Sequence, residues 1–349
     1  MKKLLVVLLA LTVIGIFAFA DDAAAAPAAS LTVGGWGRMG FELVDTYNAT
    51  QATNVSTTPG WANGNRIGVA FHGTSANIGF DWNFDYDGAT LSGTDDVAKI
   101  WAKISPMFEV ELGRIEGDTL RGKIGGDSVS VTSDATGDND TIFARFFPKQ
   151  GILLDITPMP ALYIGASIDA PVGGAAMNAM NSYQAVQVGA GYTIENVGLV
   201  RAQYIGSDTT KGAVQAAFAY TGMAGLTVDV GATIPMDSNA QMVAAGGVNY
   251  GKDALAAVIE IKATFGGASG SKTDLDVWGD ASYKVADPLA AGAEFTFEGL
   301  AASQKLLELF PYAQFNYGAG SLRVGFLAGI GLDSQPMVYK IPVVITFSF

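Results

Sequence analysis

The stretch Val338–Phe349 reads VYKIPVVITFSF, and its side chains alternate in character along the chain. Successive side chains of a β-strand point to opposite faces, so one face collects the bulky apolar residues. That face carries Tyr339, Ile341, Val343, Ile345, Phe347 and Phe349. The other face carries Lys340, Pro342, Val344, Thr346 and Ser348. A face that ends on two Phe residues gains no stability in water, so the pattern predicts contact with a second apolar medium.

Segments of about ten residues with the same alternation recur from Leu31 onward, and turn residues separate them. The clearest is Asn77–Tyr86, which places five large apolar residues on one face. The segments predict eighteen strands, or sixteen if the weakest merge. They lie near 31–44, 65–74, 77–86, 97–105, 107–115, 152–157, 161–170, 183–193, 198–206, 212–221, 226–234, 241–250, 255–265, 274–285, 289–298, 309–317, 321–331 and 338–349.

The composition indicates what kind of apolar medium the strands meet. Mean hydropathy is +0.29 and hydrophobic residues make up 49% of the chain. After Ala20 no run of about 18 apolar residues occurs, so helical membrane spans are excluded. The weak, two-residue period is typical of an antiparallel up-and-down transmembrane β-barrel, which is our predicted all-β fold class. The net charge of −13 argues against nucleic acid as a partner.

The first residues of the chain predict export. Two lysines precede the apolar run Leu4–Ala20, which ends on the small-residue pattern Ala-Phe-Ala before two acids. This is typical of a signal peptide over residues 1–20, although a retained anchor has the same pattern. We expect 21–30 to be a short tail and 31–349 a single barrel domain. The chain contains no Cys, which excludes disulfides and a lipid-anchored cysteine.

The connections between predicted strands alternate between short and long. Short links such as Pro158–Pro160 and Ala286–Pro288 alternate with longer, more polar ones such as Asp45–Gly64 and Pro171–Ser182. Bacterial single-chain barrels have even strand numbers, short periplasmic turns and longer outer loops. The alternation therefore predicts an even count, with both ends of the barrel on the side of the short turns.

This pattern resembles bacterial outer-membrane β-barrels of the porin type, in which the assembly machinery reads a final strand like Val338–Phe349. The resemblance implies a bacterial outer-membrane location, lipid contact and passive diffusion of small hydrophilic solutes or ions. It implies no cofactor and no metal, and it leaves a homotrimer open. Two alternatives remain. One is a substrate-specific transporter, for instance for hydrophobic compounds, and the other is a non-conducting structural or adhesin barrel.

If the apolar faces meet lipid, the opposite faces line the lumen. Arg or Lys on the lipid side costs about 2–4 kcal/mol at the membrane midplane, so mid-strand charge belongs inside. The candidate pore-lining residues are Arg38, Glu42, Arg66, Asp81, Asp85, Lys99, Lys103, Glu109, Glu111, Arg323 and Lys340, and later strands add others, including Arg201, Asp229 and Glu294. Pairing of the last strand with the first brings four of these together. We expect Arg323, Lys340, Arg38 and Arg66 to form a basic arc, or alternatively local salt bridges with nearby acids.

The connection 116–151 is the longest in the chain, and long loops in compact folds are usually functional or disordered. Its place after the fifth strand resembles the third loop of trimeric porins, which folds into the lumen and narrows it. The resemblance offers constriction candidates in Glu116, Asp118, Arg121, Lys123, Asp127 and Arg145. The alternatives are a further strand pair or a surface lobe.

Catalysis finds no support in the sequence. His72 is the only His, and no nucleophile motif accompanies it. One His and no Cys exclude a His- or Cys-based metal cluster. We therefore expect no enzyme activity and no catalytic, cofactor or metal site.

Overall fold

The computed structural model describes residues 29–47, 54–56, 65–87, 92–115, 151–169, 185–206, 212–267, 273–299, 305–332 and 337–349. These residues form strands and turns, and among them no helix is long and apolar enough to cross a membrane. The strands are β1 (Ser30–Tyr47), β2 (Asn54–Ser56), β3 (Arg66–Ser75), β4 (Ile78–Asp87), β5 (Ser92–Ser105), β6 (Phe108–Arg114), β7 (Gly151–Met159), β8 (Leu162–Asp169), β9 (Gln187–Ile194), β10 (Gly198–Ile205), β11 (Ala213–Met223), β12 (Leu226–Pro235), β13 (Gln241–Lys252), β14 (Leu255–Gly266), β15 (Asp274–Ala286), β16 (Leu289–Glu298), β17 (Lys305–Tyr317), β18 (Gly320–Gly325), β19 (Leu327–Leu332) and β20 (Val338–Ser348).

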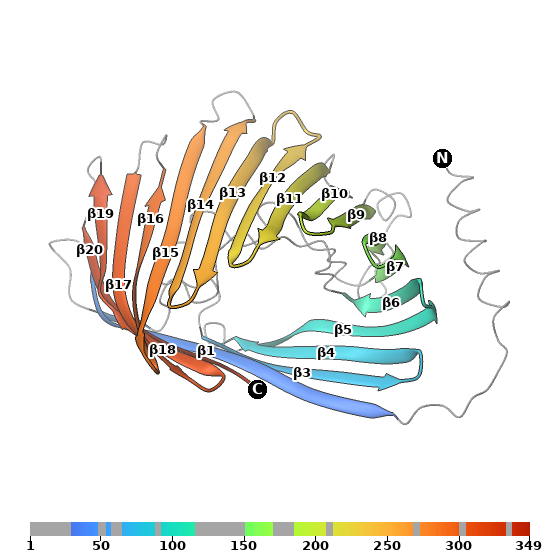
Figure 1. Cartoon of the computed structure of the whole chain (residues 1–349), viewed down its shortest axis with the longest axis horizontal. Helices are drawn as coiled ribbons and strands as arrows, with labels where there is room; N and C mark the ends of the chain where they lie inside the picture. The colour runs from blue at the N-terminus through green and yellow to red at the C-terminus, as the bar shows by residue number, and fades with distance from the viewer. Residues whose placement is uncertain are drawn as a thin grey trace.

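The strands pair antiparallel with their neighbours along the chain, and β20 pairs with β1 to close the wall (Figure 1). The three-residue β2 only flanks β1. β18 and β19 both pair with β17 and β20, so they are two halves of one wall strand. The described residues thus form a closed barrel of eighteen strands, which confirms the predicted fold class and the larger of the two predicted counts.

The interruption between β18 and β19 has a local cause. Pro311 of β17 lies between Leu309, which is opposite Ala328, and Tyr312, which is opposite Gly325. Proline has no backbone N–H and removes one hydrogen bond from the ladder. One backbone hydrogen bond is still formed at this position, from Phe326 N to the Pro311 carbonyl at 3.1 Å. The strand therefore continues past the break without changing direction.

The seam between β1 and β20 is the longest-range contact of the fold. Phe349 N donates to the Gly35 carbonyl at 2.9 Å, and Gly35 N donates to the Phe349 carbonyl at 3.0 Å. The ladder then runs from Trp36 opposite Ser348 to a bulge after Glu42, which lies opposite Pro342. The seam therefore extends to Phe349, the last residue of the alternating stretch Val338–Phe349.

The connections alternate in length, as the sequence predicts. One end of the barrel carries two- and three-residue turns, at 76–77, 106–107, 160–161, 195–197, 224–225, 253–254, 287–288 and 318–319. Ser30 lies opposite Thr74 and Phe347 opposite Gly320, so β1 starts and β20 ends at this same end. The predicted signal peptide 1–20 and the connection 116–150 lie outside the described residues, and both stay predictions.

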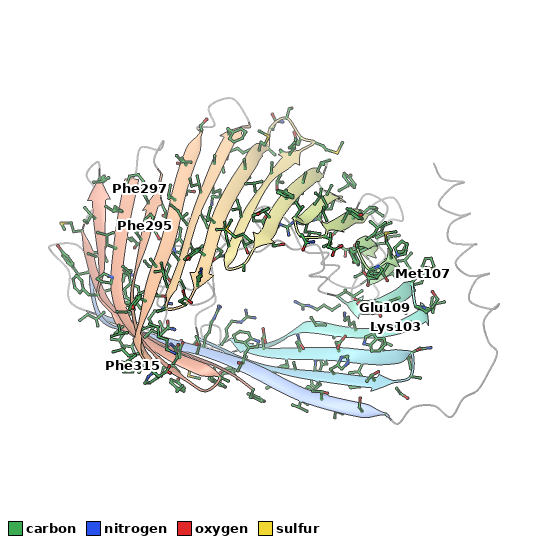
Figure 2. The ribbon with its side chains drawn as sticks, viewed as in Figure 1. Lys103, Met107, Glu109, Phe295, Phe297 and Phe315 are labelled. Carbon is green, nitrogen blue, oxygen red and sulfur yellow. The ribbon has the colours of Figure 1, made fainter. Side chains whose placement is uncertain are left out.

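The two faces of the wall are inverted relative to a water-soluble protein. Large apolar side chains are exposed on the outer face, among them Phe41, Ile78, Phe80, Trp82, Ile100, Leu112, Val230, Ile261, Phe315 and Ile345. Charged side chains are buried on the inner face, among them Glu42, Asp85, Glu111, Arg201, Asp229, Glu260, Glu294 and Arg323. Figure 2 shows side chains standing off both faces of the ribbon.

Candidate functional site

The inner face of the seam carries the ion pair Lys340–Glu42, with Nζ 3.2 Å from Oε1. The bulge in β1 and Pro342 in β20 bring these residues together, since Glu42 is opposite Pro342 and Lys340 is opposite Asp45. Glu42 is only 2% exposed, and the ion pair with Lys340 compensates part of the hydration that its carboxylate loses.

A second pair lies on β3 and β4, where Arg66 Nη2 donates to Asp85 Oδ2 at 2.7 Å. The Arg66 guanidinium lies 5.6 Å from the ring centre of Trp36, and that of Arg38 lies 5.9 Å from it. Gly68 stands between Trp36 and Asp85 in the same cross-strand row. A Cβ at Gly68 would lie 2.4 Å from the indole nitrogen, so the absent side chain makes room for this contact.

The inner face of β4, β5 and β6 holds a third group. Lys99 Nζ lies 2.8 Å from Glu111 Oε1 and 3.7 Å from Asp81 Oδ2. Asp81 also contacts the Nδ1 atom of His72. Lys103 Nζ is 3.9 Å from Glu109 Oε2, and its side chain is 57% exposed, which makes this a weak, solvated pair.

Arg323 is the centre of a fourth group, on β15 to β18. Its Nη1 lies 3.0 Å from Glu294 Oε2, and its guanidinium lies 4.1 Å from the ring centre of Tyr312. The Tyr312 hydroxyl donates to Asp280 Oδ1 at 2.8 Å. Asp280 and Glu294 are direct cross-strand neighbours, so Arg323 compensates two carboxylates that would otherwise repel each other.

The predicted basic arc is divided by these pairs. Arg323, Lys340 and Arg66 each contact a carboxylate on an adjacent or nearby strand. The geometry is therefore that of local salt bridges, the alternative that the sequence left open. The constriction candidates Glu116, Asp118, Arg121, Lys123, Asp127 and Arg145 lie outside the described residues.

The structure also joins residues whose partners the sequence could not name. Arg201 Nη2 of β10 donates to both carboxylate oxygens of Asp229 on β12, at 2.8 and 2.6 Å. Beside this pair, Gln203 donates to Gln215, which donates to Thr233, in one line across three strands. Arg201 lies opposite Ala217 of the intervening β11, and this small residue leaves space for the two longer side chains to meet.

Two apolar clusters on the inner face were missed by the sequence reasoning, which expected polar side chains there. Phe310, Tyr312, Leu327 and Val344 form one cluster on β17, β19 and β20. The other contains Ile115, Leu153, Ala217 and Ala245, and Ile115 has no exposed surface. Strand parity alone could have found Phe310 and Val344, because both fall on the predicted inner face.

The Ile115 cluster joins strands that are far apart around the wall, β7 with β11 and β13. Ala217 and Ala245 both lie opposite Gly231 of β12, so three small residues form one row on the inner face. Residues four to six strands apart cannot touch along a wall with strand spacing of about 4.8 Å. Ile115, directly after β6, therefore packs within the interior of the barrel.

No protein-family model and no curated sequence matches the chain. Among solved structures, the chain is similar to a triple mutant of the porin of Rhodopseudomonas blastica, with 14% identity, a TM-score of 0.51, and coverage of 92% of this chain and 100% of that chain. It is also similar to OmpF of Salmonella typhi in a complex with daunomycin, with 12% identity, a TM-score of 0.53, and coverage of 91% and 97%. A loop-deletion mutant of OmpT, an outer membrane protein of Vibrio cholerae, matches with 12% identity, a TM-score of 0.51, and coverage of 93% and 100%.

At these identities the similarity is one of fold. Its full-length coverage agrees with the closed wall, the alternating connections and the inverted faces described above. The chain therefore has the fold of the porin-type β-barrels of bacterial outer membranes, as its sequence predicts.

Proposed function

We propose that the protein is a porin of a bacterial outer membrane, through which small hydrophilic solutes and ions diffuse passively. One observation carries the proposal: a closed eighteen-stranded wall exposes its large apolar side chains outward and pairs its charges inward. Barrels of about this strand number are wide enough for an aqueous channel. Transport of this kind needs no covalent step and no cofactor.

The inner charges suggest the selectivity of the channel. Carboxylates outnumber cations over the chain, which has a net charge of −13, and the inner ion pairs place acids on β4, β6, β12 and β16. Rings of acidic side chains favour cations in a pore. We therefore propose a mild preference for cations over anions, with Arg38 and Arg66 opposing it locally beside Trp36.

The predicted constriction belongs to the same proposal. The buried position of Ile115 on the inner side supports a chain that enters the lumen after β6. The small row Ala217, Gly231 and Ala245 supports it as well, because large side chains there would exclude such a chain. We propose that the connection 116–150 narrows the channel.

Reconstitution tests the conduction. The purified protein in planar lipid bilayers is expected to give discrete single-channel steps, and liposomes that contain it are expected to swell in sugars up to a size limit. Liposomes without protein are the control. A barrel that inserts but passes neither ions nor sugars would favour the structural or adhesin alternative. Exclusion of all sugars with uptake of one apolar compound would favour the specific transporter.

Selectivity is tested by neutralising the two arginines beside Trp36. Arg38→Gln combined with Arg66→Gln removes two positive charges from the inner wall, so the reversal potential in a KCl gradient is expected to shift toward cation selectivity. Lys284→Gln is the control, because Lys284 lies near the 287–288 turn, is 53% exposed, and pairs with the 85% exposed Asp287. An equal reversal potential in all three proteins contradicts the assigned pore lining.

A further inference from the structure

We propose that the inner face of β6 and β7 carries a binding site for a divalent cation of the size of Ca²⁺, formed by the carboxylates of Glu109, Glu111 and Asp155. Passive diffusion requires no such site, and the pore-lining interpretation of Glu109 and Glu111 from the sequence included no metal. The site goes beyond the proposed function, because a cation can bind there whether or not the barrel conducts.

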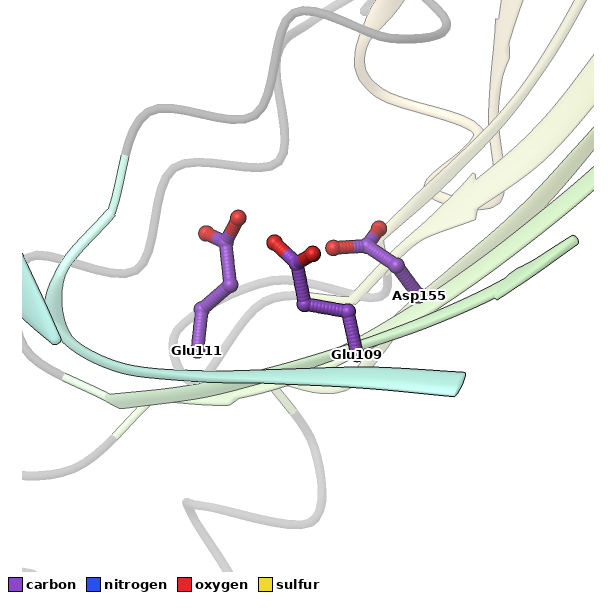
Figure 3. A group of neighbouring side chains, drawn as sticks. All are labelled: Glu109, Glu111 and Asp155. Atoms are coloured by element: carbon purple, nitrogen blue, oxygen red, sulfur yellow. The ribbon is translucent and has the colours of Figure 1, made fainter. Parts of the chain in front are cut away.

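The three carboxylates converge from two adjacent strands (Figure 3). Glu109 of β6 lies directly opposite Asp155 of β7, and Glu111 follows two residues later on the same face of β6. One oxygen of each residue lies within 4.8 Å of one oxygen of each of the others. Ca²⁺ binds oxygens at 2.3–2.6 Å, so two oxygens that share the ion can be up to about 5 Å apart. The spread fits one shared ion without movement of the backbone.

Glu111 supplies a second, independent observation that points to a cation at this position. The residue is only 6% exposed. Its Oε1 accepts a hydrogen bond from Lys99 at 2.8 Å. Its Oε2 is buried and has no hydrogen-bond partner among the residues that the structure describes. Buried carboxylate oxygens are normally satisfied, and a cation between the three carboxylates would satisfy this one.

The neighbouring positive charges leave the group acidic. Lys99 is shared between two carboxylates, because its Nζ lies 2.8 Å from Glu111 Oε1 and 3.7 Å from Asp81 Oδ2. Lys103 is 3.9 Å from Glu109 and largely solvated. Like charges directly opposite in a sheet repel each other, as Glu109 and Asp155 must. A bound divalent cation would remove this repulsion.

The chemistry of the donors selects the class of ion. All three are carboxylates, and no His or Cys side chain belongs to the group. Oxygen-only sites favour hard cations such as Ca²⁺ and disfavour softer transition metals. The Tyr163 hydroxyl donates to Asp155, which orients that one carboxylate on β7.

Terbium luminescence tests the site in the intact protein in detergent, independently of conduction. Trp101 lies opposite Glu111 on the inner face, and Tyr163 contacts Asp155, so both rings are close enough to sensitise Tb³⁺. We expect a saturable Tb³⁺ signal at physiological KCl that added Ca²⁺ displaces. Ca²⁺ is also expected to raise the unfolding temperature, because it binds the folded state.

Glu109→Gln combined with Asp155→Asn removes two ligands and is expected to weaken Ca²⁺ binding by about 10- to 100-fold, at least the effect of losing an outer-shell partner. Asp276→Asn is the matched control and should bind as the parent does. It also removes an inner carboxylate paired to a lysine, since Asp276 Oδ2 lies 3.4 Å from Lys262 Nζ.

Three results overturn the proposal: no Tb³⁺ signal that Ca²⁺ can displace, an unchanged affinity in the double variant, or an equal loss in Asp276→Asn. If the double variant does not fold, the Ca²⁺ affinity of the single variant Glu109→Gln is measured instead, and an unchanged affinity overturns the proposal. Glu109 is 25% exposed, and its neutralisation leaves the buried pair of Glu111 and Lys99 intact. Absence of conductance would contradict the proposed porin function and leave these binding results unaffected.

Discussion

The inner wall is stabilised residue by residue through pairs that compensate buried charge. Arg201 and Asp229 are each 3% exposed, and both hydrogen bonds between them come from one guanidinium nitrogen. Removing two charges from water is expensive, so such a pair adds little compared with apolar residues of equal size. Removal of one partner is different, because the other charge is then buried without compensation.

Arg201→Met is therefore expected to lower the free energy of unfolding by about 3–5 kcal/mol. The second change Asp229→Leu in the same chain should restore part of this loss, because the Asp229 carboxylate is then no longer buried without Arg201. Urea titration in lipid vesicles, followed by tryptophan fluorescence, measures both. Lys284→Met, at the exposed rim pair, serves as the control and should leave stability nearly unchanged. A single variant as stable as the parent contradicts the pairing.

The closing strand shows how one element completes the fold. β20 pairs with β1 from Ser348 opposite Trp36 to Val338 opposite Tyr47. Beyond this ladder, two further backbone hydrogen bonds join Phe349 to Gly35. The Phe349 ring also lies over Gly35, where a Cβ would approach it to 2.6 Å. The backbone and the ring thus contribute separately to the closure of the barrel.

Deletion of Phe349 is expected to lower stability by about 1–3 kcal/mol, since two hydrogen bonds with net values of about 0.5–1.5 kcal/mol each are lost. Phe349→Ala keeps both bonds and should lose less. Folding into pure lipid vesicles, read from heat-dependent gel mobility, measures the physical part without assembly factors. Equal losses in the two variants would assign the whole effect to the ring.

The contact of the outer face with lipid can be tested by placing a charge at different depths in the membrane. Ile261 lies near the middle of β14 and is 46% exposed, whereas Tyr283 lies near the end of β15 and is 57% exposed. In a lipid bilayer, Ile261→Arg is expected to cost about 2–4 kcal/mol and Tyr283→Arg about 0–1 kcal/mol. Unfolding titrations in vesicles compare them. Two equally small losses would mean that water covers the outer face.

The whole molecule is held together by more than its wall. Ile115 belongs to one buried cluster with Leu153 of β7, Ala217 of β11 and Ala245 of β13, so this interior cluster links distant strands. A barrel stabilised only by neighbouring strands would not depend on one inner side chain.

Ile115→Ala is expected to lower the free energy of unfolding by about 2–5 kcal/mol, the range for large-to-small changes at fully buried sites. Ile152→Ala is the control, because Ile152 lies next to Leu153 in β7 but is 49% exposed on the outer face. Its loss should be clearly smaller. Unfolding titrations of the two variants in vesicles compare the losses. A larger loss for Ile152→Ala than for Ile115→Ala would contradict the proposed packing of Ile115 inside the barrel.

Much of this fold was predictable because the signal is local. Alternation with period two assigns each residue of β4 or β20 to a face, and turn residues mark the ends, so strand positions, faces and even parity follow from neighbouring residues. Pro311 illustrates the limit. Its missing N–H explains the break between β18 and β19, but only the register places Phe326 opposite it.

The amino-acid pattern alone predicts an antiparallel barrel of eighteen or sixteen strands with apolar residues outside and charges inside, since side-chain alternation is a property of the strand. The strand pairing settles the count at eighteen. Which charges meet is visible only in the folded barrel. Arg201 finds Asp229 two strands away, Asp155 joins Glu109 and Glu111, and Ile115 reaches β11 and β13. These contacts depend on register, on barrel curvature and on small residues in between, and no local pattern in the chain encodes them.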